Sequence, residues 1–318
     1  TDQAPLRVDT AGGNTSTGTL TATAGKDINI EEVSGDLTIH QVVSGGHTTL
    51  TAPGSMTDTN GNATVEAADA QKKANDAKNL SDAAQAEATV RDQYASSLER
   101  TADEKQALAE QAQKRVEEAE KKLKDTLAAD PKADVTDLQN QLENLRKLRD
   151  AHKAVADQAR KNAEDQRALA DAAAQKAQKL LNEAQKAQTD ADKALENARN
   201  TPPSVQTGGD LTLNAGGSIG EEDNALDTQV GGKTNLKSGG NVNLSEQGDM
   251  HLGEVQNPEN AELRLDSTGG ITSDSVLGGS HLEANALGGS LDVQTDVDGI
   301  SGTAAENITV NNAGDLEM

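Results

Sequence analysis

Apolar and polar residues alternate in short stretches near both ends of the chain. Each stretch has one apolar face and one polar face, which predicts a half-buried β-strand. Neighbouring stretches lie roughly ten residues apart, and most begin just after a glycine. The stretches are 26–30, 36–39 and 47–50, followed after a long gap by 210–213, 233–236, 241–244, 249–252, 261–265, 290–293 and 307–310.

The gap, residues 67–200, has a different period. Steps of three and four residues from Ala67 to Thr126 meet an apolar residue at fourteen of eighteen positions. A second series from Leu138 to Ala198 does so at fifteen of eighteen. This spacing is typical of coiled coils. Pro131 interrupts it, which predicts a turn near 128–132 between two antiparallel arms of about 63 and 68 residues.

The segments on either side of the helical region resemble each other. The run 25–30 matches 240–244, and the run 35–39 matches 248–252. Repeats of this kind stack so that neighbouring units bury each other's apolar stripe. We therefore predict a right-handed parallel β-helix, a solenoid, interrupted by an antiparallel two-helix coiled-coil hairpin. The predicted divisions are 1–66 (β-helix), 67–200 (hairpin) and 201–318 (the same solenoid resumed).

Composition favours a structural role over catalysis. The chain has no Phe, Trp or Cys, and Tyr94 is its single aromatic residue, so we expect thin cores of small aliphatic side chains. The net charge is −24, and residues 67–200 hold 24 basic against 26 acidic residues, so the flanks carry nearly all of the excess. Such acidic flanks argue against nucleic-acid binding. No apolar run is long enough to predict membrane insertion, and the chain reads as a piece of a longer protein.

Acidic residues supply few candidates for chemistry. Aspartates after glycines suit turns, and a calcium ladder is the alternative, although the strict glycine-rich nonapeptide of such ladders is absent. We therefore predict no cofactor and leave weak Ca²⁺ binding open. The turn aspartates are Asp36, Asp210, Asp249 and Asp315. The tightest acidic cluster, which lacks a partner base or an aromatic sugar platform, is Asp292, Asp296 and Asp298.

Five large polar side chains interrupt the apolar seams of the hairpin, and we expect them to fix its register. Pairing the arms at a residue sum near 261 puts Arg91 near Asp171 and Lys105 near Asp157. The same index puts a half-buried imidazole across from Ala109, with a metal site or pH switch as the alternative. The five seam residues are Arg91, Lys105, Arg149, His152 and Gln166.

The repeats resemble the filamentous-haemagglutinin-type repeats of large bacterial adhesins, many of them exported by two-partner secretion. The stretches that carry this resemblance are 208–220, 239–244 and 248–255. It covers both flanks, about 180 residues, and implies an extracellular β-helical stalk on the bacterial cell surface. The hairpin departs from that family's continuous stem, so the resemblance assigns it no role.

We therefore expect a structural segment of an extracellular surface filament or adhesin rather than an enzyme. Its expected partners are other copies of the filament and an unidentified host or neighbouring-cell surface. One alternative is the stalk of a contact-dependent-inhibition toxin-delivery protein, and another is a polysaccharide-active β-helix enzyme. The expected partner contact lies at the hairpin tip, namely Ala129, Asp130, Pro131 and Lys132.

Overall fold

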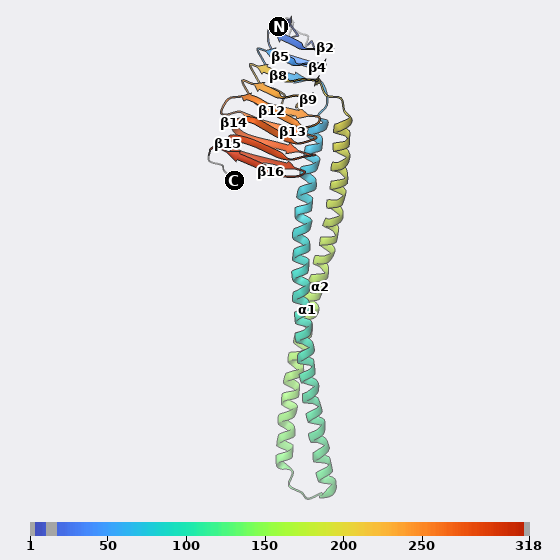
Figure 1. Cartoon of the computed structure of the whole chain (residues 1–318). Helices are drawn as coiled ribbons and strands as arrows, with labels where there is room; N and C mark the ends of the chain where they lie inside the picture. Colours follow the sequence, from blue (N-terminus) through green and yellow to red (C-terminus); the bar gives the residue numbers. More distant parts are fainter. Residues whose placement is uncertain (1–3, 11–17, 315–318) are drawn as a thin grey trace. The chain divides into compact units, whose positions relative to one another are not determined.

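The computed structural model describes residues 4–10 and 18–314, which form strands and two long helices (Figure 1). The strands before the helices are β1 (Leu6–Val8), β2 (Leu20–Ala24), β3 (Ile28–Glu32), β4 (Leu37–Ser44), β5 (Thr48–Ala52) and β6 (Met56–Asp58). The helices are α1 (Ala63–Ala129) and α2 (Thr136–Asn200). The strands after them are β7 (Val205–Thr207), β8 (Leu211–Ala215), β9 (Leu226–Val230), β10 (Thr234–Lys237), β11 (Val242–Glu246), β12 (Met250–Gln256), β13 (Glu262–Ser267), β14 (Ile271–Ala286), β15 (Leu291–Ala304) and β16 (Ile308–Asn312).

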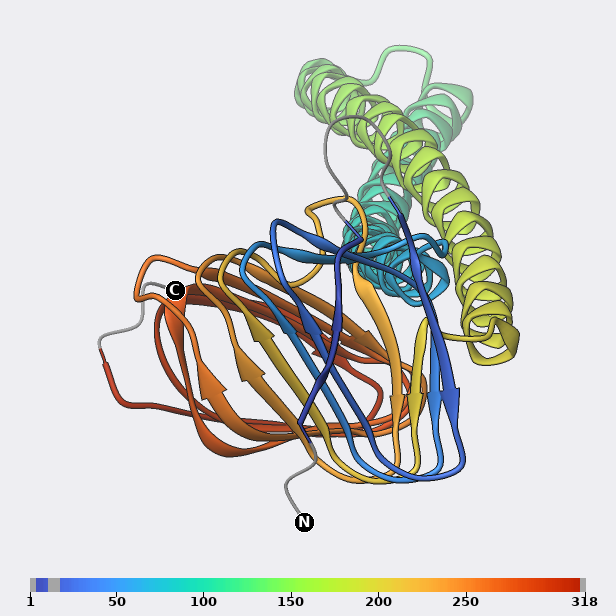
Figure 2. The ribbon, with the colours of Figure 1, turned by 90° about the horizontal axis from the view of Figure 1, so that it is seen from above.

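The strands belong to one parallel sheet of sixteen strands. Successive strands alternate between two halves of this sheet, so that most strands pair with the strand two places away in the sequence. One half contains the pairs β3–β5, β8–β10 and β10–β12, and the other contains β7–β9, β9–β11 and β11–β13. The halves face each other across the interior (Figure 2).

The two halves are joined through β14. Residues 271–273 of this long strand pair with β12, and residues 281–286 pair with β13. The path through the sheet therefore starts at β1, turns at β14 and returns to β2. One continuous but open sheet results.

The predicted right-handed β-helix is wrong. Its coils would close, whereas this sheet is not closed and its strand order does not define a solenoid. The reason lies in the strand pairing. Among the described strands, β14 alone pairs with both β12 and β13, and the path through the sheet ends at β1 and β2, which do not pair with each other.

The core of the sheet unit is aliphatic. Its largest fully buried side chains come from alternating positions of the strands, as the period-two pattern requires. They include Ile30, Leu37, Ile39, Leu50, Met56, Leu211, Leu213, Ile219, Leu226, Leu244, Met250 and Leu252. Because no aromatic ring is available, stacked leucine and isoleucine rows fill the space between the two halves.

Strands from before and after the helices are direct neighbours. In the β5–β8 pair the register runs without a break from Thr48↔Leu211 to Ala52↔Ala215. On the other half, β4 pairs with β7 through Val42↔Val205. The helical insertion therefore leaves the hydrogen-bonding ladder continuous.

The chain divides into two compact units. One contains Thr1–Asn75 and Lys186–Met318, and the other is the hairpin segment Asp76–Gln185. The first turns of α1 and the last turns of α2 belong to the sheet unit, where Ala67 and Ala198 pack in a small cluster with Leu287. This contact explains why the compact units divide inside the helices rather than at residues 67 and 200.

Candidate interaction surfaces

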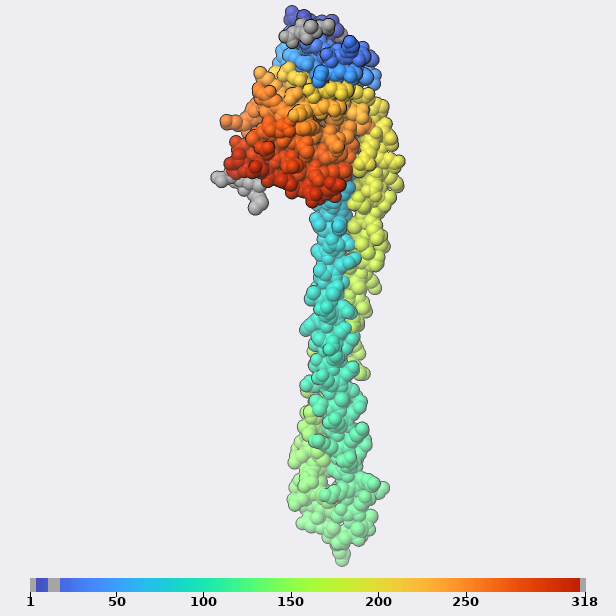
Figure 3. All heavy atoms as spheres, in the orientation of Figure 1, coloured from blue at the N-terminus to red at the C-terminus, as the bar shows by residue number. Residues whose placement is uncertain are grey.

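The hairpin helices bury one narrow seam. Along α2 a residue is buried at almost every seventh position, namely Leu142, Ala156, Ala163, Ala170, Ala177, Ala184, Ala191 and Ala198. The series skips only position 149, where an arginine stands. Small alanine side chains let two helix axes approach closely. Figure 3 shows the side chains of the two helices meeting along the hairpin.

The structure places the five predicted seam residues as follows. Arg91 is exposed and pairs with Glu87 on its own helix, with its Nε 2.9 Å from Oε1, rather than with an acid of α2. Arg149 is half-buried and pairs with the adjacent Asp150, Nη2 to Oδ1 at 2.8 Å. The other three are half-buried: Lys105, His152 and Gln166. Their role in setting the register stays a prediction.

Arg167, which sequence reasoning missed, links the two helices. Its Nε and Nη2 donate to the two carboxylate oxygens of Glu99 at 2.8 and 2.9 Å. Its Nη2 also donates to Ser96 Oγ at 3.0 Å, and its Nη1 pairs with Asp92 at 2.5 Å. These hydrogen bonds lower the pKa of Glu99 and raise the pKa of Arg167. The sequence did contain a signal for this contact. Arg167 directly follows a seam position of α2, and acidic residues lie beside the seam of α1 on the same edge.

A second interhelical pair lies nearer the tip. Arg146 Nη2 lies 2.7 Å from Glu120 Oε1. The sums of the paired residue numbers are the same for Glu120–Arg146 and Glu99–Arg167, so both pairs fit one antiparallel register. Both therefore lie along one edge of the hairpin.

The connection between the helices is exposed. The predicted contact residues Ala129, Asp130, Pro131 and Lys132 are all open to solvent. Asp130 Oδ1 accepts the backbone N–H of Lys132 at 2.9 Å, which forms a tight turn. Asp134 then accepts the N–H and hydroxyl of Thr136 at 3.1 and 2.7 Å and caps α2, and these bonds lower the pKa of Asp134.

Buried acids fix the strands from which the hairpin departs. Asp58 ends β6, and its Oδ2 accepts the hydroxyl of Ser204 at 2.6 Å and the N–H of Asp227 at 3.1 Å. One carboxyl group therefore joins the segment before α1 to the segments after α2. Burial raises the pKa of Asp58, and burial with the nearby Asp58 charge raises the pKa of Asp227 to about 7.

Two further carboxyl groups are buried in the same unit. Glu246 accepts Thr228 Oγ1 at 2.5 Å and the Val230 N–H at 2.6 Å, and burial raises its pKa to about 8. Asp266 pairs with Arg264 at 2.9 Å, and burial raises its pKa to about 6 against the opposing effect of the guanidinium. These groups carry protons more readily than exposed acids do.

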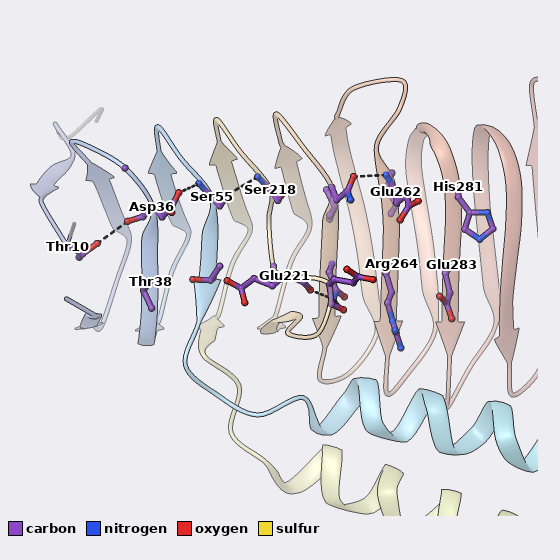
Figure 4. A pocket seen from close by; sticks show the side chains of 18 of the residues that line it. Thr10, Asp36, Thr38, Ser55, Ser218, Glu221, Glu262, Arg264, His281 and Glu283 are labelled. Carbon is purple, nitrogen blue, oxygen red and sulfur yellow. Dashed lines mark hydrogen bonds between the residues drawn. The ribbon is translucent and has the colours of Figure 1, made fainter. Parts of the chain in front are cut away.

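The sheet unit also carries an open groove of about 1130 Å³ (Figure 4). Acids dominate its charged lining, and its arginine, Arg264, is engaged by Asp69 at 3.0 Å and by Asp266. Several of its polar side chains already bond backbone N–H groups: Asp36 accepts from Ser55 at 2.7 Å. The acidic residues lining the groove are Asp36, Glu221, Glu222, Glu262 and Glu283.

The predicted acidic cluster lies on a strand surface. Asp292, Asp296 and Asp298 are exposed along β15, where they alternate with buried residues such as Val293 and Val297. In the described part of the chain, no group of three or more His, Cys, Asp or Glu residues is arranged to hold a metal ion. The cluster is accounted for by strand alternation.

The turn aspartates form hydrogen bonds to the next strand-turn unit. Asp210 Oδ1 accepts the Lys233 N–H, and Asp249 Oδ1 accepts the Gly270 N–H, each at 2.8 Å. Asp36 makes the equivalent bond, while Asp315 lies outside the described residues. These carboxylates act as turn acceptors, and calcium binding remains a separate prediction.

Comparisons with protein-family models, with curated proteins and with solved structures gave no match. Among the described helices, none has a stretch long and apolar enough to cross a membrane.

Proposed function

We propose that this chain is a structural segment of an extracellular bacterial surface protein, in which the sheet unit is a scaffold and the helical hairpin is a contact element. It acts by binding rather than by catalysis. Its proposed partners are other copies of the same protein and the surfaces of neighbouring cells.

The continuous register across the insertion carries this proposal. The β5–β8 and β4–β7 pairs join strands from both sides of the hairpin, so the backbone ladder of the sheet runs past the insertion without using the helices. The strands pair without the hairpin, so we infer that the hairpin has a role of its own. The resemblance of the strand repeats to adhesin repeats supports the extracellular location.

The composition of the hairpin supports a contact role as well. Residues 76–185 hold 19 basic and 22 acidic residues, whereas the rest of the chain holds 10 against 31. Strongly acidic surfaces of two copies repel each other, while a nearly neutral surface does not. The hairpin is therefore the part of the chain suited to close contact.

Antibody labelling tests the location. Antibody fragments against residues 76–185 are applied to intact and to permeabilised cells of the producing bacterium, and the label is quantified by flow cytometry. Equal labelling of both is expected. Labelling that requires permeabilisation contradicts the proposal.

A further inference from the structure

The two edges of the hairpin differ in chemistry. One edge carries the interhelical ion pairs Glu99–Arg167 and Glu120–Arg146. All four of these residues directly follow a seam position, which is the e position of a heptad whose seam is a and d. In an antiparallel pair of helices the e positions of both strands share one edge, so the g positions share the other.

The g edge carries exposed large apolar side chains among its polar ones. Tyr94 and Leu108 of α1 are 54% and 42% exposed, and each precedes a buried seam alanine. On α2, Val155 and Leu169 are 51% and 49% exposed and also precede buried alanines. Leu80 and Leu148 extend the same positions by further heptads. Large apolar side chains gathered on one exposed edge mark an interaction surface.

This edge is self-complementary. Along α1 its successive g positions read Glu87, Tyr94, Thr101, Leu108 and Arg115. A two-fold axis at Thr101 brings Tyr94 of one copy opposite Leu108 of the second, and Glu87 opposite Arg115. In the single chain Glu87 is satisfied by Arg91 on its own helix, so the edge keeps a neutral charge balance before pairing.

The matching positions of α2 fit the same axis. They read Leu148, Val155, Asn162, Leu169 and Lys176. An axis at Asn162 brings Leu169 opposite Val155 of the second copy, leaves two asparagines facing each other, and places Leu148 opposite Lys176. Asn162 and Thr101 occupy the same level of the hairpin, because their numbers add to nearly the sum that aligns the two arms.

The available surface is adequate for a stable pair. The run from Glu87 to Arg115 is about 42 Å long at ~1.5 Å per residue, and two helices side by side are about 20 Å wide. Their product, about 800 Å² per copy, matches a standard protein interface. A second copy of the hairpin is thus an occupant with the right length, apolar pattern and charge.

We propose that the g edge of the hairpin is a homotypic interface at which two chains pair antiparallel into a four-helix bundle centred on Thr101 and Asn162. This deepens the proposed function, because it names the partner of the contact element as a second copy. The pairing proposal rests on the proposed function in one respect, namely that the hairpin is a contact element.

Sedimentation of the whole chain tests the pairing. The wild type is expected to be a dimer that dissociates on dilution, and Leu108→Glu is expected to weaken it by about 100-fold or more, as the loss of a central anchor does. The matched control is Ala107→Glu, which adds the same charge at an exposed neighbouring position on another face and should leave the dimer intact. A wild-type monomer at every accessible concentration overturns the proposal, as does equal weakening by both substitutions.

Exchanging two charges tests the pairing without substituting an apolar residue of the interface. Glu87→Arg should weaken the dimer by placing it opposite Arg115, and adding Arg115→Glu in the same chain should restore it. Helix content measured by circular dichroism confirms that each variant is folded. Failure of the double variant to recover contradicts the antiparallel arrangement.

Disulfide trapping locates the axis, because the natural chain has no cysteine. Thr101→Cys is expected to cross-link two chains, whereas Ala107→Cys and Ala129→Cys are not, since only the first lies at the axis. Cross-linking at position 129 without 101 overturns the arrangement. All these measurements use purified protein, so their failure is distinct from failure of the surface labelling that tests the proposed function.

Discussion

At the scale of single residues, buried carboxyl groups in the sheet unit accept hydrogen bonds that join neighbouring strands. Asp58 joins strands separated by the whole hairpin, and Asp227 and Ser245 are side-chain partners on adjacent strands. Because these groups are buried, their protonation state affects the free energy of unfolding. In the hairpin, by contrast, arginines form ion pairs with acidic residues that lie near solvent.

The raised pKa of Asp227 predicts a loss of stability with rising pH. Its pKa is about 7 in the fold and near 4 in the unfolded chain, so its contribution is complete below about pH 4 and lost as the pH rises through about 7. Asp227→Asn should remove up to about 4 kcal/mol of that pH dependence. Urea unfolding of both proteins at about pH 4 and about pH 8 measures it.

The control for this experiment is Asp292→Asn, at an exposed position of β15. It should leave the pH dependence of the wild type unchanged. Equal pH dependence in the wild type and the Asp227 variant would show that this carboxyl group stays ionised in the fold.

Arg167 predicts a measurable interhelical contribution. Arg167→Gln removes its ion pairs to Glu99 and Asp92 and should lower the midpoint of thermal unfolding of the hairpin only slightly, because the site is near solvent and screened. Thermal unfolding followed by the helical signal reports the change. Arg100→Gln, at an exposed position, is the matched control and should be nearly neutral.

At the scale of elements, close stacking of the glycine turns decides how the strands follow one another. A Cβ atom on Gly208 would lie 2.7 Å from the backbone oxygen of Gly45 in the neighbouring turn. Neither backbone can move without breaking the parallel ladder. Turns of this kind end most of the short strands and return the chain to the opposite half of the sheet.

Gly208→Ala is therefore expected to destabilise the sheet unit by about 1–3 kcal/mol, the usual cost of overpacking. Gly61→Ala is the control, since nothing lies within 4 Å of its added Cβ. Urea unfolding of the two variants gives the comparison. Equal stability of the two proteins would contradict the close stacking.

The alternation of apolar and polar residues predicted where strands occur better than it predicted how the strands pair. Alternation marks the strands, and the seam from Leu138 to Ala198 follows the buried side of α2. The sequence match between 25–30 and 240–244, however, equates β3 with β11, which lie in opposite halves of the sheet. Strands of both halves show the same alternation, so similarity between units does not fix which half a strand joins or whether the sheet closes.

The candidate site was predictable only in part. The exposed tip and the polar interruptions of the seam follow from the heptad pattern and Pro131. The interhelical contact of Arg167 was not predicted because this residue lies beside the seam, where charged residues are common. Its partner there depends on the exact register of the two helices. The buried acids escaped because Asp58 and Asp227 meet only when the sheet forms.

At the scale of the whole molecule, the scaffold and the contact element are expected to separate cleanly. Replacing 76–185 by a short glycine-rich turn should leave the strands paired, since the sheet register is continuous across the insertion. Circular dichroism should show loss of helix with retention of strand, and urea unfolding should remain cooperative. An unfolded product would show that the sheet needs the hairpin.

Binding of the purified chain to intact cells of the producing bacterium tests the central claim most directly. Fluorescently labelled wild type and the hairpin-shortened chain are compared over the same concentration range, after both are shown to be folded. The wild type is expected to bind saturably and the shortened chain to bind no more than an unrelated acidic protein. Equal binding by the two chains would contradict the claim that the hairpin is the contact element.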